Sequence, residues 1–198
     1  YGFAVELDGS RSHVEVPAPV DLPVDAEPRT ISLSFKWTEI RWPCPAMQLL
    51  GYGNNAPGQR FGLSIECNPH GLGIETCLYA RTFKWNGDDD DWHHLAVVFP
   101  EGGKNASDTE IYFDGDLEDA DDRAADQKLQ TTGSPLTIGC VPQAKVYFFN
   151  GIIDDVAIFP VALSDKEIQA IARFGLEGAR TVCPSGRLTA SWGRLKSQ

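Results

Sequence analysis

The histidines are the side chains best suited to general-base or metal chemistry, and their positions argue against both roles. His93 and His94 stand side by side after Trp92 in a predicted strand. Adjacent residues of a strand point to opposite faces, so the two rings cannot chelate one ion together. His13 and His70 are isolated, and no serine lies near a plausible base. The sequence therefore contains no nucleophile–base arrangement.

Some of the five tryptophans could stack against sugar rings. Sugars present apolar C–H faces, and an exposed indole offers a large contact area at a low entropic cost. Trp37 and Trp92 fall in predicted apolar strands and are expected in the core, whereas Trp42 and Trp85 fall in loop-like sequence and are expected to be exposed. With polar residues added, the predicted ligand-binding residues are Trp42, Asn54, Tyr79, Arg81 and Trp85. The alternative is that the loop tryptophans only pack their loops against the core.

The five cysteines contain no C-x-x-C pair, which excludes a zinc ribbon or a thioredoxin-type motif. Cys67 and Cys77 flank a turn around Asn68–Gly71, and a hairpin there could bring them face to face. We therefore predict a disulfide between Cys67 and Cys77, provided that the hairpin gives it the geometry it needs. The odd number of cysteines leaves at least one thiol unpaired within a monomer.

The formal net charge of −11 bears on the possible partners. A surface this negative repels nucleic acid and anionic lipid headgroups, so we expect neither partner. The longest apolar runs, such as Leu95–Phe99, are too short to cross a bilayer, so no membrane insertion of this segment is expected. Acidic residues gather at Asp88–Asp91 and from Asp114 to Asp126, either as solvated loops or as cation ligands. Neither run has the order of an EF-hand loop.

Alternation of apolar and polar residues predicts an all-β fold. In Ile31–Trp37 every second residue is apolar, which is typical of a half-buried strand. Many short strands separated by Gly and Pro indicate a sandwich or a barrel. The other predicted strands are Phe3–Leu7, His13–Val16, Met47–Tyr52, Arg60–Glu66, Ile74–Phe83, His93–Phe99, Glu110–Phe113, Leu136–Ile138 and Ile152–Phe159.

One short helix is predicted over Ser164–Phe174. The sequence S-D-K-E from Ser164 to Glu167 forms a capping box, in which the two side chains satisfy backbone amides of the first turn. Ile168 and Ile171 provide an apolar stripe, and Gly175 provides the stop signal after the helix.

Several segments, in order along the chain, resemble the laminin-G-like jelly roll of the concanavalin A-like lectin/glucanase superfamily. The resemblance implies two antiparallel sheets packed face to face, with a concave face, a rim of loops and one short helix near the C-terminus. It implies a jelly-roll domain over residues 1–182 and a C-terminal extension over 183–198. The matching segments are Val5–Ser10, His13–Val16, Trp92–Val98, Ile111–Gly115, Leu136–Gly139, Phe149–Phe159 and Ala162–Ser164.

The resemblance also guides the expected function. Glucanase relatives carry an E-[ILV]-D-x-x-E strand, whereas Ile153–Val156 lacks both of the glutamates that this pattern requires. We therefore expect a non-catalytic module of an extracytoplasmic bacterial protein that binds a glycan or cell-surface polysaccharide. An adhesion or protein-interaction module is the alternative, and a hydrolase or lyase with an unfamiliar site ranks below both. Because the chain begins at Tyr1, we expect it to be part of a longer or processed protein.

A structural calcium ion is a further expectation from the resemblance, which implies that the segments around Asp8 and Asp154 lie side by side. Asp8, Asp154 and a carbonyl near Gly9 would supply the oxygen ligands that calcium prefers. The alternative is that Asp8 forms an Asx-type turn and Asp154 binds backbone amides. The sequence leaves both alternatives open.

Overall fold

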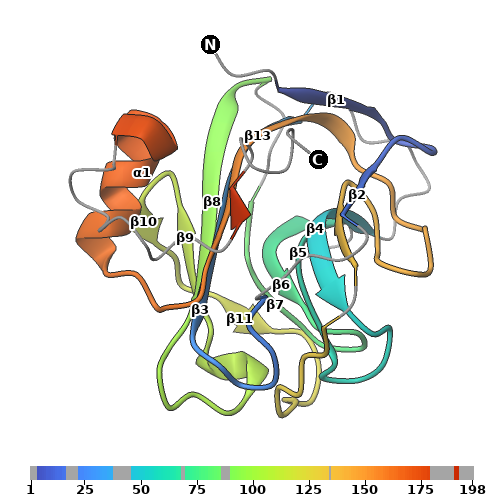
Figure 1. Ribbon diagram of the computed structural model, residues 1–198, viewed down its shortest axis with the longest axis vertical. Helices are drawn as coiled ribbons and strands as arrows, with labels where there is room; N and C mark the ends of the chain where they lie inside the picture. Colours follow the sequence, from blue (N-terminus) through green and yellow to red (C-terminus); the bar gives the residue numbers. More distant parts are fainter. Residues whose placement is uncertain are drawn as a thin grey trace.

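Strands that bury one face form two antiparallel sheets, and the sheets pack face to face (Figure 1). The computed structural model describes residues 4–16, 22–37, 46–67, 70–85, 90–133, 135–178 and 190–191. Sheet A has the spatial order β1 (Val5–Asp8), β13 (Asn150–Phe159), β3 (Arg29–Trp37), β8 (Trp92–Phe99), β9 (Glu110–Phe113) and β10 (Asp116–Leu117). Sheet B has the order β11 (Asp121–Asp122), β7 (Ala80–Phe83), β6 (His70–Glu75), β5 (Arg60–Cys67), β4 (Ala46–Gly53), β12 (Leu136–Ile138) and β2 (Val14–Val16). The predicted all-β jelly-roll sandwich is confirmed.

The apolar residues of the alternating strands meet between the two sheets. In β3 the side chains of Leu33 and Phe35 are fully buried, and in β5 those of Phe61, Leu63 and Ile65 are too. Each such side chain contributes roughly 1.5–3 kcal/mol when it leaves water. The outward-facing residues of the same strands are therefore the ones free to serve a function.

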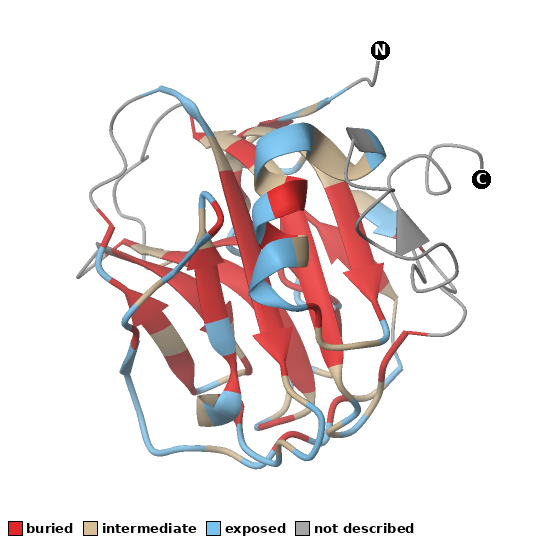
Figure 2. Ribbon diagram, turned by 90° about the vertical axis from the view of Figure 1, so that its left-hand side faces the viewer, coloured by how far each residue is buried: buried red, intermediate tan, exposed pale blue. Residues whose placement is uncertain are grey.

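A smaller apolar cluster forms on the outer face of sheet A, beneath α1 (Asp165–Gly178). Figure 2 shows this helix lying across the strands of the sheet, with buried residues on its inner side. Ile168 and Ile171 of the helix pack with Tyr112 and Phe159 of the sheet. The helix thus covers an apolar area that sheet A would otherwise expose.

The two ends of α1 follow the sequence signals. The Glu167 carboxylate accepts hydrogen bonds from the backbone amide of Ser164 at 2.9 Å and from its hydroxyl at 2.8 Å. Helical geometry is interrupted at Gly175, whose φ of 67° suits a residue without a side chain. The single predicted helix near the C-terminus is confirmed.

One detail of the predicted chain course is wrong. Ile74–Phe83 is not one strand, because a turn over residues 76–79 separates β6 from β7. Within the predicted extension over 183–198, β14 (Ala190–Ser191) pairs with β13 in sheet A. The remaining element, η1 (Ala106–Asp108), is one turn of 3-10 helix before β9.

Arg29 places a guanidinium group inside the core with no exposed surface. All of its N–H groups are satisfied by neutral acceptors, which are the Tyr52 hydroxyl at 2.7 Å and the carbonyls of Pro23, Val24, Asp25 and Glu27. The same guanidinium lies 5.2 and 5.7 Å from the ring centres of Phe61 and Phe99. One side chain therefore joins the segment before β3 to both sheets.

We predict that Arg29→Lys will lower the free energy of unfolding by about 3 kcal/mol or more. Several buried acceptors lose their donors, because a lysine ammonium cannot reproduce the planar arrangement of N–H groups in the guanidinium. Urea denaturation measures this loss. Arg11→Lys is the matched control, since the Arg11 side chain is 91% exposed and should cost little. Equal effects of the two substitutions would contradict the proposed role of Arg29.

His94 makes folding stability depend on pH. Its ring is buried on the outer side of sheet A, with Nε2 2.9 Å from the Ser32 hydroxyl, and burial lowers the pKa of His94 from 6.5 to about 4. The folded protein therefore binds this proton less readily than the unfolded chain does. The contribution of neutral His94 to the stability of the fold is therefore complete above about pH 6.5 and is lost as the pH falls toward 4.

We predict that wild type loses about 3 kcal/mol of stability between pH 7 and pH 4 through this residue, on the basis of 1.36 kcal/mol per pKa unit. The measurement is urea unfolding of wild type and His94→Gln over that range. The difference in the free energy of unfolding between wild type and His94→Gln should shrink as the pH falls. Carboxylates titrate in both proteins, so this difference reports His94 alone. A difference that is constant with pH would show that His94 does not titrate as described.

Candidate functional site

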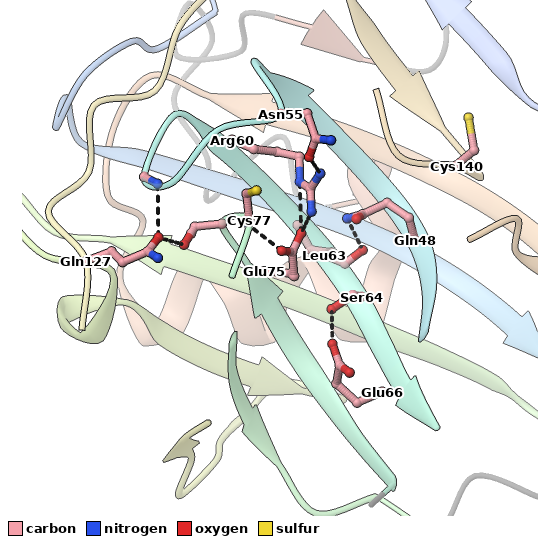
Figure 3. A network of polar contacts seen from close by, with 12 residues as sticks. Gln48, Asn55, Arg60, Leu63, Ser64, Glu66, Glu75, Cys77, Gln127 and Cys140 are labelled. Carbon is pink, nitrogen blue, oxygen red and sulfur yellow. Dashed lines mark hydrogen bonds and ion pairs between the residues drawn. The ribbon is translucent and has the colours of Figure 1, made fainter. Parts of the chain in front are cut away.

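The outer side of sheet B carries a row of polar side chains, which we call the polar face. In β5, Arg60, Ser64 and Glu66 alternate with the core residues, so they point away from the core. Gln48 of β4 and Glu75 of β6 complete the polar face, and Figure 3 shows the group on the central strands of the sheet. Gln48, Arg60 and Ser64 are themselves buried, so Glu66 and Glu75 are the members of the polar face that a polar ligand could contact.

The polar face is organised around an ion pair between Arg60 and Glu75 (Figure 3). Arg60 Nε donates to Glu75 Oε2 at 2.8 Å, its NH2 group donates to the same oxygen, and its NH1 group donates to Asn55 Oδ1. The other Glu75 oxygen accepts the Cys77 amide at 2.5 Å. The Arg60 and Glu75 side chains are only 5% and 15% exposed. Both groups are therefore held in one orientation.

Two turns meet at the end of sheet B next to this ion pair. Gln127 Oε1 accepts the Gly58 amide at 2.9 Å and the Thr76 hydroxyl at 3.1 Å, which links the β4–β5 turn to the β6–β7 turn. In the β6–β7 turn, Cys77 and Leu78 both have positive φ, at 65° and 68°. Each non-glycine residue in this conformation costs about 1–2 kcal/mol. The Gln127 contacts help to hold this strained turn in place.

Glycine brings the backbone close to the polar groups. Gly62 faces Gln48, whose side-chain amide donates to the carbonyls of Leu50 and Leu63 at 2.7 Å each. A Cβ atom at Gly62 would lie 2.3 Å from Gln48 Nε2 and 3.0 Å from the Leu50 carbonyl. A side chain at position 62 would therefore displace Gln48 from the polar face.

Glu66 is the second carboxyl group of the polar face. Its pKa is raised by burial and by the nearby charge of Glu75, and the Ser64 hydroxyl lies 3.5 Å from Oε1. Glu66 pairs with Gly71 and Glu75 pairs with Gly62, so four residues, or roughly 13 Å, separate the two positions along the strands. Glu66 and Glu75 are therefore anchored toward opposite ends of the β5–β6 pair, and their charges still interact.

Two of the predicted ligand-binding residues, Tyr79 and Arg81, share a partner at the β7–β11 edge of sheet B, whereas Asn54 follows β4, with β5 and β6 between. Asn54 Oδ1 accepts the Gln143 side-chain amide at 3.0 Å. The Tyr79 hydroxyl and Arg81 NH1 both donate to Asp122 Oδ1, at 2.8 and 2.6 Å. Tyr79 is only 1% exposed, so its ring is not free to stack on a ligand. Trp42 lies outside the described residues.

The expected positions of two tryptophans are reversed. Trp85 was expected to be exposed, but it is 8% exposed and packs in the core against Phe35 and Trp37, with ring centres 5.6 and 5.2 Å away. Trp92 was expected in the core, but it is 48% exposed at the start of β8. Loop position did not predict exposure, because the residues after β7 fold back over the core.

Tyr147 is an exposed aromatic residue that sequence reasoning missed. It is 44% exposed, and its carbonyl accepts the Gln48 amide at 2.8 Å, so it lies beside the polar face. Its φ of 58° is one of several positive values in the loop before β13. The pattern V-Y-F-F around it resembles a strand more than a loop, and the sequence held no other signal of its exposure.

The predicted calcium ligands are not brought together. Asp8 pairs with Asn150, and Asp154 lies four residues further along β13, roughly 13 Å away. Asp8 Oδ1 accepts the amides of residues 10, 11 and 12 at 2.9 Å each, and these bonds hold the pKa of Asp8 well below its usual value. Asp8 thus forms the Asx-type turn next to Gly9. The structural calcium ion itself stays a prediction, and no cluster of three or more metal-binding side chains occurs within the described residues.

The predicted Cys67–Cys77 disulfide is wrong. Cys67 is disulfide-bonded, whereas Cys77 and Cys140 are free thiols. Because β6 begins at His70 and pairs it with Cys67, Cys77 lies at the far end of the strand, roughly 20 Å away at 3.3 Å per residue. The hairpin is tighter than the cysteine spacing suggested. The partner of Cys67 is neither of the free cysteines.

Comparison with protein families finds a match over most of the chain. The model of the concanavalin A-like lectin/glucanases superfamily matches residues 8–169. A comparison with curated proteins finds no match. Among the residues that the structure describes, no helix has the length and apolar character to span a membrane.

Solved structures with a similar fold include several lectin-like proteins. The heptameric pentraxin of Limulus polyphemus is 12% identical over 84% of this chain and 80% of its own, with a TM-score of 0.59. The CBM40 domain of the Ruminococcus gnavus IT-sialidase, bound to α2,3 sialyllactose, is 22% identical over 86% and 98%, with a TM-score of 0.58. Domain 4 of the Geobacillus stearothermophilus arabinanase AbnA, in complex with arabinotriose, is 16% identical over 85% and 76%, with a TM-score of 0.57.

We predict that Arg60→Ala will lower the free energy of unfolding by about 3–5 kcal/mol, because Glu75 becomes a buried carboxylate without its counter-charge. The double variant Arg60→Met with Glu75→Met should be more stable than Arg60→Ala, since it removes both charges. Urea denaturation of the single and double variants measures the coupling. A double variant that is less stable than Arg60→Ala would contradict this account of the ion pair.

Proposed function

The chain belongs to the concanavalin A-like lectin/glucanases superfamily, and on that basis we propose that it is a carbohydrate-binding module without hydrolytic activity of its own, working outside the cytoplasm. The observation that carries this proposal is the polar face, where Arg60 is fixed by Glu75 and Asn55. At the other end of the face, the loop that carries the exposed Tyr147 pairs with Gln48. Sugar recognition needs both fixed polar groups and an apolar surface.

The rigidity of the polar face suits sugar hydroxyl groups. A hydroxyl group both donates and accepts hydrogen bonds, so it can pair with carboxylates and with side-chain amides. Asn54 and Gln143 already bind one another at 3.0 Å, and Glu75 is fixed by Arg60. Because these groups are ordered before a ligand arrives, little conformational entropy is lost on binding.

Similar structures support the same proposal. Two of them contain an oligosaccharide, sialyllactose in one and arabinotriose in the other. The arabinanase is described as extracellular, which supports a position outside the cytoplasm for this chain as well. The sequence lacks the paired glutamates of the glucanase strand at Ile153–Val156, which supports binding without glycoside hydrolysis.

We predict that the purified chain will bind at least one oligosaccharide on a glycan array, with or without calcium. Tyr147→Ala should weaken that binding about fivefold with little change in stability, because an exposed ring contributes roughly 1 kcal/mol to a stacked contact. Isothermal titration and urea unfolding measure the two effects.

Trp92→Ala is the matched control for Tyr147→Ala. It removes a comparably exposed aromatic side chain from sheet A rather than sheet B. If Trp92→Ala abolishes binding and Tyr147→Ala leaves it unchanged, the ligand binds to sheet A and the proposed site is wrong. If the chain binds neither an array glycan nor a polysaccharide, the proposal of a carbohydrate-binding function is itself wrong.

An adhesion or protein-interaction module is the second candidate. Such a module would use a flat apolar patch. The large exposed apolar residues among the described ones are Leu78, Trp92, Leu117, Val146, Tyr147 and Phe174, and the helix that carries Phe174 packs against β10, which carries Leu117. Pull-down of a protein partner in the absence of any glycan binding would favour adhesion instead.

A further inference from the structure

The charged groups around the polar face bear on the chemical class of its ligand. Recognition of a sugar carboxylate needs a guanidinium or ammonium group with free donors. Arg60 offers little to a ligand, because its side chain is only 5% exposed and each of its three nitrogens already donates one hydrogen bond, to Glu75 or to Asn55. A ligand carboxylate near this guanidinium would also meet the charge of Glu75.

Two further cations near the polar face are also paired. Arg81 NH1 donates to Asp122 at 2.6 Å, at the edge of sheet B. Lys145, in the loop that carries Tyr147, forms an ion pair with Glu15. Each of these two cations already has a carboxylate partner, which offsets its charge toward an incoming anion.

The carboxyl groups are more accessible than the cations that they hold. The Glu75 side chain is 15% exposed against 5% for Arg60, and the Asp122 side chain is 39% exposed against 25% for Arg81. Glu66 is a further acidic group, and its pKa is raised mainly by burial. With a net charge of −11 for the whole chain, an anion that approaches this side meets negative potential.

Arg123 is a further cation on this side, and it is the group that could reverse the conclusion. It is exposed, and its Nε donates to the Thr82 hydroxyl at 3.0 Å on β7. Its positive charge lowers the pKa of Glu66, so the two side chains are near enough to offset one another. Burial and Glu75 outweigh this effect on Glu66, so Arg123 is the exposed cation that a ligand carboxylate could reach, and its substitution is part of the test.

From these contacts we propose that the polar face binds uncharged glycans and rejects glycans that carry a carboxylate. This inference rests on the proposed carbohydrate-binding function and specifies its substrate class. It sets the chain apart from the fold relative whose structure contains sialyllactose. The carboxylates of the polar face accept hydrogen bonds from neutral sugar hydroxyls, whereas they repel sialic and uronic acids.

The test uses matched pairs of glycans that differ by an acidic group, such as lactose with 3′-sialyllactose and galactobiose with digalacturonic acid, together with the neutral glycan that binds best on the array. Affinities are measured by titration at low salt and at 1 M NaCl. We expect the neutral member of a bound pair to bind at least tenfold more tightly at low salt. The ratio should fall at 1 M NaCl, where charges are screened within about 3 Å.

Substitutions locate the source of the discrimination. Glu66→Gln removes one negative charge from the polar face and should narrow the neutral-to-acidic ratio severalfold. Glu6→Gln removes the same charge from an exposed position on β1 of sheet A, so it should leave the ratio unchanged. Equal effects of the two substitutions would overturn the proposal, because net charge rather than the polar face would then set the preference.

The remaining outcomes separate this inference from the proposed function. Tighter binding of the acidic member, lost in Arg123→Gln, would overturn the inference and leave carbohydrate binding intact. Binding of neither member of any pair, nor of any array glycan, would overturn both. Urea unfolding of each variant confirms that a change in the ratio does not come from loss of the fold.

Discussion

The two sheets are tied together by one buried charge, and the rest of the sandwich depends on how that charge is satisfied. The guanidinium of Arg29 lies between Phe61 and Phe99 and takes the carbonyls of the segment before β3 as its acceptors. A buried charge is tolerated only when its donors are all used, so it fixes the backbone that supplies the acceptors. Tyr52 joins the same arrangement, since its hydroxyl binds both Arg29 and the Pro23 carbonyl.

The same requirement organises the opposite side of sheet B. Arg60 is nearly as buried as Arg29, but its acceptors are a carboxylate and an amide that lie on the surface of the sheet instead of between the layers. The first arginine therefore stabilises the core, and the second fixes the groups that face a ligand. The proposed function and the proposed preference for uncharged sugars both follow from the fact that Glu75 is already committed to Arg60.

Most of the fold could be predicted from the sequence because its signals are local. The alternation in Ile31–Trp37 and the capping box at Ser164 each act within a few residues. The candidate site could not be predicted, because Asn55, Arg60 and Glu75 meet only through strand register, and no spacing in the chain marks them as a set. The reversed positions of Trp85 and Trp92 have the same origin, since burial of an aromatic residue depends on what packs above it.

The chain segment from β10 to β11 affects whether copies of this domain associate. These two consecutive strands form the edges of the two sheets, one strand in each, so the seven residues 116–122 border the sandwich on one side. Both strands are only two residues long, and five of these seven residues are acidic. Exposed strand edges invite pairing with another chain, and short, charged edges prevent it. Along this border, crowded copies of the domain would repel one another instead of joining their sheets into larger aggregates.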